Sequence, residues 1–169
     1  MASDAEPTTS VLFVCAGNIC RSPTAETVFS ALVEHAGLAR SITVDSAGTG
    51  DWQVGEPPDA RAAEQARLRG YTMVDRCARQ LAFDDFDRFE WILAMDRQNL
   101  YELEALCPRD FRGHLGLFME FAPDAGAIEV PDPYHGETED FERVLDLTER
   151  AARGLLDAVR DSLDARSYD

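Results

Sequence analysis

Cysteine, arginine and serine side chains stand close together near the start of the chain, at a spacing that could support phosphoryl chemistry. Cys15 directly follows the apolar run 11–14, and Arg21-Ser22-Pro23 comes after five intervening residues. This order predicts a strand, a tight loop and the start of a helix. A loop whose backbone N–H groups turn inward, with a helix N-terminus behind it, can hold a tetrahedral oxyanion. The pattern therefore predicts a phosphate-binding loop with a nucleophile at its base.

Each side chain of this loop has a chemical reason to be there. Gly17 permits backbone angles that a side chain would oppose, and Ser22 is expected to cap the following helix with Pro23 at its first position. Arg21 can grip two phosphate oxygens through its planar fork and stays charged. These surroundings favour the thiolate form of Cys15, which would be the nucleophile. The Ser22 hydroxyl is also expected to donate to the Cys15 sulfur, which favours the charged form further. A lone cysteine at a strand end is more often a plain core residue, but the spacing to Arg21 favours the catalytic interpretation.

Alternating strands and helices must position these residues. The alternation predicts βαβ units and a parallel sheet covered on both faces, with ligands bound beyond the carboxyl ends of the strands, where Cys15 falls. The last helix is the clearest, since its apolar residues recur every three or four positions. Strands are predicted at 10–14, 42–45, 90–95 and 114–118, and helices near 23–37, 57–70, 97–107 and 138–164.

Two stretches rich in glycine or proline are predicted to be irregular loops over the active edge of the sheet. The first, 48–58, carries Trp52, and the second, 122–136, contains three prolines. The rest of the chain fits one domain over 9–166, preceded by a polar tail over 1–8 that is expected to be disordered.

Composition limits the classes of function. No apolar run approaches the roughly 18 residues that a membrane span requires, so no membrane association is expected. The four cysteines form no C-x-x-C pair, which favours reduced thiols and a cytoplasmic location over a disulfide framework or zinc site. The net charge is −16 and all 16 basic residues are arginine. The missing lysine excludes Schiff-base and Walker-type chemistry, and the acidity argues against nucleic-acid binding.

Further motifs agree with the loop at Cys15. They are Asp45-Ser46-Ala47-Gly48-Thr49, Ala78-Arg79-Gln80, Met95-Asp96 and Asp132-Pro133-Tyr134. With these motifs the chain resembles the low-molecular-weight protein tyrosine phosphatase family from about Val11 to about Leu163. The resemblance implies a three-layer α/β fold with a four-stranded parallel sheet in the flavodoxin-like order 2-1-3-4 and helices on both faces. It also implies a phosphoric monoester hydrolase that forms a cysteinyl-phosphate, with no metal and no cofactor.

The resemblance assigns catalytic roles to Cys15, Arg21 and Asp132. A departing phenoxide needs a proton at neutral pH, and Asp132 would supply it as general acid, although Asp-Pro by itself is an ordinary turn signal. The residues that would bind phosphate and substrate are Ala16, Gly17, Asn18, Ile19, Cys20, Ser22, Trp52 and Tyr134.

Three positions would support the loop, and two of them leave alternatives open. In the family, Ser46 and a histidine support the loop asparagine, here Asn18; Ser46 is present, but Arg76 occupies the place of the histidine, so a rearranged hydrogen-bond network is expected. Asp96 fits a family position near the site and fits a helix N-cap equally well.

The residues that would surround the substrate are also open to two interpretations. Trp52 and Tyr134 resemble the aromatic walls that hold the family's substrate ring, but Trp52 could simply pack in a surface loop. His135 stands where many members have a second tyrosine, and it would either tune access or be a solvated loop residue. Cys20 could trap an oxidised Cys15 as a disulfide or pack behind the loop.

Competing functions remain on the same fold. Arsenate reduction needs further cysteines after the third strand, and 93–97 has none. Phosphoarginine phosphatases in this family carry a threonine where this chain has Ile19. A non-catalytic phosphopeptide-binding module would not need Cys15 or Asp132. The expected partner is a tyrosine-phosphorylated protein or peptide, and the expected state is a monomer, with weak pairing through the Trp52 loop left open.

Overall fold

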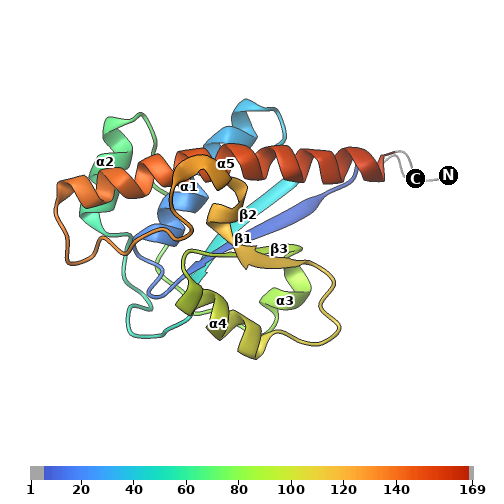
Figure 1. The fold of residues 1–169 in the computed structure, drawn as a ribbon, viewed down its shortest axis with the longest axis horizontal. Coiled ribbons are helices and arrows are strands. Elements are labelled where there is room, and N and C mark those ends of the chain that lie inside the picture. The colour runs from blue at the N-terminus through green and yellow to red at the C-terminus, as the bar shows by residue number, and fades with distance from the viewer. Residues whose placement is uncertain (1–5, 168–169) are drawn as a thin grey trace.

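A four-stranded parallel sheet forms the centre of the computed structural model, which describes residues 6–167 (Figure 1). The strand order is β2-β1-β3-β4, as the family resemblance implied. The strands are β1 (Thr9–Cys15), β2 (Ile42–Gly48), β3 (Trp91–Ala94) and β4 (His114–Leu117). Because β2 lies on one side of β1 and β3 on the other, the order reverses beside β1, and the carboxyl end of β1 opens onto a crevice.

Helices cover both faces of the sheet, which gives three layers (Figure 1). One face carries the long α5 and α1, and the other carries α3 and α4; α2 packs against α5 and α1. The helices are α1 (Arg21–His35), α2 (Ala60–Leu68), α3 (Asp85–Arg88), α4 (Arg97–Leu106) and α5 (Thr138–Arg166), with 3₁₀ turns at Phe118–Phe121 and Pro123–Ala125. No helix within 6–167 is both long and apolar enough to cross a membrane.

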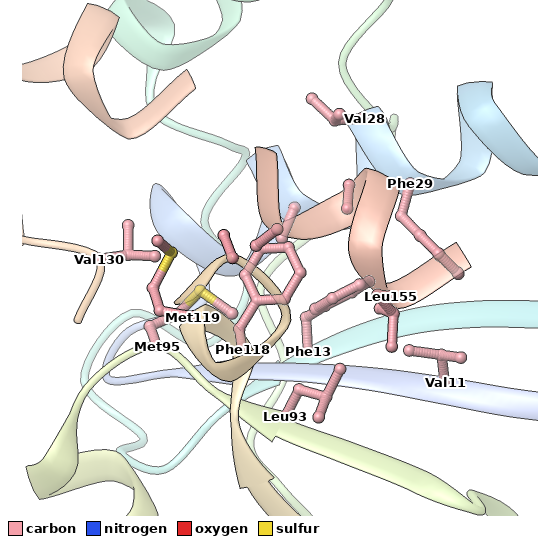
Figure 2. Packing of buried hydrophobic residues seen from close by; sticks show 14 of the residues in the cluster. Val11, Phe13, Val28, Phe29, Leu93, Met95, Phe118, Met119, Val130 and Leu155 are labelled. Atoms are coloured by element: carbon pink, nitrogen blue, oxygen red, sulfur yellow. The ribbon is translucent and has the colours of Figure 1, made fainter. Parts of the chain in front are cut away.

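Successive side chains of β1 point to opposite faces of the sheet, so the strand contributes to the hydrophobic core on each face. Val11 and Phe13 point into the core beneath α1 and α5, while Leu12 and Val14 point into the smaller core beneath α4. All four side chains are fully buried. The Phe13 ring packs edge-on against Phe118 at a centroid distance of 5.0 Å, in the cluster that Figure 2 shows. Burial on both faces holds β1 rigidly, and therefore fixes the point at which Cys15 leaves the sheet.

The observed elements confirm the predicted strands and helices in order, but the prediction missed the short helix α3 before β3. Two further expectations need correction. The first helix begins at Arg21 and its N-cap is Cys20, so Ser22 is not the cap and Pro23 is the third helical residue. Pro23 is still tolerated there, because the first four N–H groups of a helix have no partner within the helix. The stretch 122–136 was expected to lack regular structure, but a 3₁₀ turn occupies part of it.

Of the expected disordered tail at 1–8, residues 1–5 lie outside the described part of the chain, and Thr8 accepts a hydrogen bond from Arg166 Nη1 through its carbonyl at 3.0 Å.

Candidate active site

The loop after β1 has its carbonyl groups turned outward. Thr49 N–H donates to the Cys15 carbonyl at 2.9 Å, and Gly50 N–H donates to the Ala16 carbonyl at 3.0 Å. Within the described part of the chain, the N–H groups of 19–22 have no hydrogen-bond acceptor. Since the carbonyls are occupied from outside, these donors are left for a bound anion, which the N-terminus of α1 also favours.

Asn18 holds the loop in its shape from within. Its φ is +59°, and it is the sole non-glycine residue with positive φ among residues 6–167. Asparagine tolerates this left-handed conformation better than most residues, but still at some cost. The side chain compensates with three hydrogen bonds: Nδ2 donates to Ser22 Oγ at 2.9 Å and to Ser46 Oγ at 3.0 Å, and Oδ1 accepts from Arg79 N–H at 3.0 Å.

A buried carboxylate sets the direction of the hydrogen bonds to Asn18. Ser46 Oγ donates its single proton to Glu26 Oε1 at 2.7 Å, so it can only accept from the Asn18 amide. Glu26 is 2% exposed, and a carboxylate so deeply buried requires a partner of opposite charge. That partner is Arg76, whose guanidinium contacts Glu26 and also lies 2.7 Å from Asp45 Oδ1.

The expected rearrangement around Arg76 therefore takes a definite form. Arg76 pairs with Glu26, Glu26 accepts from Ser46 Oγ, and the Asn18 amide still donates to Ser46 Oγ. The loop asparagine keeps its support although a permanently charged side chain stands where the family has a histidine.

The Cys15 thiol lies at the end of this hydrogen-bond network. Because Asn18 Nδ2 donates to Ser22 Oγ, the hydroxyl proton of Ser22 remains free to donate. Ser22 Oγ lies 3.0 Å from Cys15 Sγ, closer than the 3.4 Å that separates it from the Ala47 carbonyl. Asn18 N–H also points at Cys15 Sγ, at 3.3 Å. Two donors directed at one buried sulfur stabilise its anionic form.

Arg21 closes the other side of the loop. Its side chain is almost fully buried, and Nη1 donates to Asp96 Oδ2 at 2.7 Å and to the Val130 carbonyl at 3.0 Å. Burial alone would lower the pKa of Arg21, but the charges of Cys15 and Asp96 raise it above its usual value. The guanidinium therefore stays charged and is held in one orientation, ready to bind oxygens of a phosphoryl group.

Asp96 fulfils both of the roles that its sequence position suggested. Its Oδ1 accepts from Asn99 N–H at 2.8 Å as the N-cap of α4, and its Oδ2 holds Arg21. One side chain thus ties the start of α4 to the phosphate-binding loop.

Asp132 approaches the loop from the segment that precedes α5. Its Oδ2 lies 3.9 Å from Arg21 Nη2, and its Oδ1 accepts a hydrogen bond from Tyr134 N–H at 3.1 Å. The side chain is 55% exposed. Oδ1 thus accepts a hydrogen bond, while Oδ2 accepts none from the described residues.

A pocket of about 320 Å³ joins these groups. Trp52 and Tyr134 form part of its wall, and both are exposed, at 65% and 40%. The Trp52 ring also packs on Gly50, where it leaves no room for a Cβ. The lining consists of Cys15, Ala16, Gly17, Ile19, Cys20, Arg21, Trp52, Gln53, Asp132, Tyr134 and His135.

Cys20 shares this pocket but differs chemically from Cys15. Burial, followed by the charges of Asp59 and Cys15, raises the pKa of the Cys20 thiol far above its usual value. Cys20 is therefore a neutral thiol at physiological pH. In the part of the chain that the structure describes, no group of three or more metal-ligating side chains is assembled.

The structure brings together all of the predicted site residues, either in the pocket or directly behind the loop. Sequence reasoning missed Glu26, Gln53 and the Val130 carbonyl. Glu26 had a detectable signal, since it is a charged residue on the apolar face of a predicted helix. Gln53 and the Val130 carbonyl had none, because their roles depend on where two loops meet.

Comparisons with known proteins agree with this geometry. The family model described as low molecular weight phosphotyrosine protein phosphatase matches residues 10–165. A low molecular weight protein-tyrosine-phosphatase of Streptomyces coelicolor is 43% identical over 161 residues, which cover 93% of this chain and 97% of that protein.

Two solved structures are similar over most of the chain. A protein tyrosine phosphatase from Entamoeba histolytica, crystallised with Hepes in its active site, has a TM-score of 0.88 at 36% identity and covers 92% of this chain and 99% of its own. The Drosophila arginine phosphatase DARP has a TM-score of 0.82 at 31% identity, with 88% and 96% covered.

The fold and its loop define a phosphatase that works through a thiol. The chain belongs to the low molecular weight phosphotyrosine protein phosphatase family.

Two substitutions at Asn18 test whether activity depends on its backbone angle or on its side-chain hydrogen bonds. Asn18→Gly removes the strain and Asn18→Ala keeps it, but both variants lose the three side-chain bonds. We expect both to lower kcat for p-nitrophenyl phosphate by tenfold or more, since the orientation of Ser22 is lost in each, which corresponds to about 1.4 kcal/mol or more in the barrier. Steady-state kinetics measure this. Full activity in Asn18→Gly would mean that only the backbone angle matters.

Proposed function

We propose that the protein hydrolyses phosphotyrosine in proteins through a cysteinyl-phosphate intermediate, with Cys15 as nucleophile, Arg21 as phosphate ligand and Asp132 as general acid. The single observation that supports this best is the position of the Cys15 sulfur at the base of the loop, with two donors directed at it. Membership of a family of tyrosine phosphatases supports the same reaction.

The first step transfers the phosphoryl group to sulfur. The Cys15 thiolate attacks phosphorus while the bond from phosphorus to the tyrosyl oxygen breaks, and Asp132 delivers the proton from Oδ2 to that oxygen. Tyrosine leaves as the neutral phenol, and a thiophosphate ester remains on Cys15. Ser22, which donated to the sulfur, helps the sulfur to depart in the next step.

The second step returns the enzyme to its starting state. Asp132, now a carboxylate, takes a proton from water as the water oxygen attacks phosphorus, and the bond between sulfur and phosphorus breaks. In both steps negative charge is spread over the three equatorial oxygens. The free N–H groups of the loop and the fixed Arg21 fork are placed to bind these oxygens, so electrostatic stabilisation supplies most of the acceleration.

The pocket walls would select the substrate. Trp52 and Tyr134 both line the pocket that contains Cys15, and a phenyl phosphate held by these rings would reach the sulfur. A tyrosine-phosphorylated protein is thus the proposed substrate. The net charge of −16 opposes nucleic-acid substrates. The four free cysteines suit a reducing compartment, so we also propose a cytoplasmic location, and a monomer as the working form.

Phosphoarginine is the second candidate substrate, because a similar structure is an arginine phosphatase. The side chain that could decide between them is Ile19, which lines the pocket and packs against the small buried cluster of Cys20, Ala62 and Phe141. Its apolar branched surface suits an aromatic ring and offers no acceptor to a guanidinium group, so the aryl substrate is favoured.

The covalent mechanism is tested with p-nitrophenyl phosphate and a phosphotyrosine peptide. We expect Cys15→Ser to reduce kcat at least 10³-fold, because an unactivated hydroxyl is a poor nucleophile. Asp132→Asn should lower kcat by about 10²–10⁴-fold, because the leaving oxygen receives no proton. Steady-state rates measure both, and Glu129→Gln is a matched control on the same loop. Normal turnover without Cys15 would refute the proposal.

The choice of substrate is tested at Ile19. We expect the wild type to hydrolyse phosphotyrosine at a higher kcat/KM than phosphoarginine. We expect Ile19→Thr to shift this ratio about 10- to 200-fold toward phosphoarginine, since one such side-chain change is worth roughly 1–3 kcal/mol of discrimination. The two rates are measured by phosphate release. A wild type that prefers phosphoarginine would reverse the assignment.

Reversible oxidation is tested at Cys20. Peroxide would convert Cys15 to a sulfenic acid, and the Cys20 sulfur would displace water from it to form a disulfide. We expect thiols to restore activity after peroxide treatment of the wild type but only in part after treatment of Cys20→Ser. Residual phosphatase activity after dithiothreitol measures this. Full recovery of Cys20→Ser would show that Cys20 simply packs behind the loop.

A further inference from the structure

The aromatic wall at Tyr134 is braced from outside the pocket by a residue that the mechanism does not use. The guanidinium carbon of Arg61, at the start of α2, lies 5.5 Å from the centre of the Tyr134 ring and 4.7 Å from the centre of the Phe141 ring. Phe141 is buried in α5, whereas Tyr134 is largely exposed. Arg61 therefore links a fixed ring to the ring that borders the substrate, through two cation–π contacts.

Asp59 fixes the orientation of Arg61. The guanidinium binds Asp59 in a two-pronged arrangement, with Nε 3.1 Å from Oδ1 and Nη2 2.9 Å from Oδ2. Asp59 N–H in turn donates to the Ile19 carbonyl at 2.8 Å, which ties this pair to the phosphate-binding loop. The two-pronged pair orients the guanidinium toward the rings, and Asp59 links that orientation to the loop.

Tyr134 has little else to hold its ring. In the described chain its hydroxyl makes no hydrogen bond, and its backbone N–H binds Asp132 without constraining the side chain. The neighbouring His135 ring meets it edge-on at 4.9 Å but lies in the same loop and moves with it. The contact from α2 is therefore the one that relates the ring to the rest of the site.

We propose that Arg61 is a positioning residue that sets the affinity for aromatic phosphate esters by holding the Tyr134 ring in its place in the pocket wall. The inference rests on the proposed function. The proposed role of Arg61 concerns binding of the ring and not the chemical step, because the segment that bears Asp132 is anchored separately. Val130 N–H donates to the Met95 carbonyl at 2.8 Å, and the Val130 carbonyl accepts from Arg21. Loss of the brace should therefore raise KM for an aryl ester and leave kcat nearly unchanged.

The decisive variant is Arg61→Met, which keeps the length of the side chain and removes its charge. We expect KM for p-nitrophenyl phosphate and for a phosphotyrosine peptide to rise about two- to fivefold, the range that one exposed cation–π contact can supply. The inhibition constant of inorganic phosphate should stay the same, because phosphate contacts only the loop. Arg61→Lys, which keeps the charge above the rings but loses the fork to Asp59, should raise KM less than Arg61→Met does.

Arg67→Met is the matched control. Arg67 lies on the same helix and also pairs with a carboxylate, Glu64, at 2.7 Å, but it touches no pocket residue. We expect its kinetics to equal those of the wild type. An unchanged KM in Arg61→Met would overturn the inference, as would a parallel rise in the phosphate inhibition constant, which would point to a damaged loop. If the wild type hydrolyses no p-nitrophenyl phosphate at all, the proposed function itself fails.

Discussion

The directed hydrogen-bond chain that ends at the Cys15 sulfur is the constraint on which the rest of the site depends. Glu26 must accept, Ser46 must then donate to it, and the Asn18 amide is left to donate to both serines. Only then can the Ser22 proton turn toward sulfur. Because each group has a limited number of donors and acceptors, reversing any one bond would leave a buried polar atom unsatisfied, and that cost holds the whole network in one state.

The loop concentrates positive charge at one point of a protein that is otherwise strongly acidic. A protein of net charge −16 repels an anionic substrate at a distance. Within the loop, however, the backbone N–H groups, the end of α1 and the buried Arg21 all direct positive charge at one point. Asp96 keeps Arg21 in place without cancelling the N–H groups, since its own two oxygens are taken by Arg21 and Asn99. Binding thus depends on short-range contacts, which salt screens little.

Sequence reasoning predicted the strands and helices that have a clear hydrophobic pattern. It failed at a helix start where a hydroxyl had competing hydrogen-bond partners. The apolar run before Cys15, the period of two along β1 and the helical spacing after Thr138 predicted the right elements. Ser22 was predicted to cap α1, because Ser-Pro is typical of a helix start. In the structure the helix begins two residues earlier, at Arg21, so the predicted cap is wrong. The Ser22 hydroxyl instead contacts Asn18 and, as also expected from the sequence, Cys15. Tertiary hydrogen bonds outweighed the local preference.

The sequence by itself was enough to predict the fold class from the alternation of strands and helices, and to predict a phosphate-binding loop with Cys15 and Arg21 from residue type and spacing along one short segment. Only the tertiary structure decided how Arg76 is accommodated, which oxygen of Asp132 is free, and that Arg61 stands behind Tyr134. These features join side chains from separate elements, such as Glu26 on α1 with Arg76 before α3. Their geometry arises from packing of the layers, and no pattern within one segment encodes it.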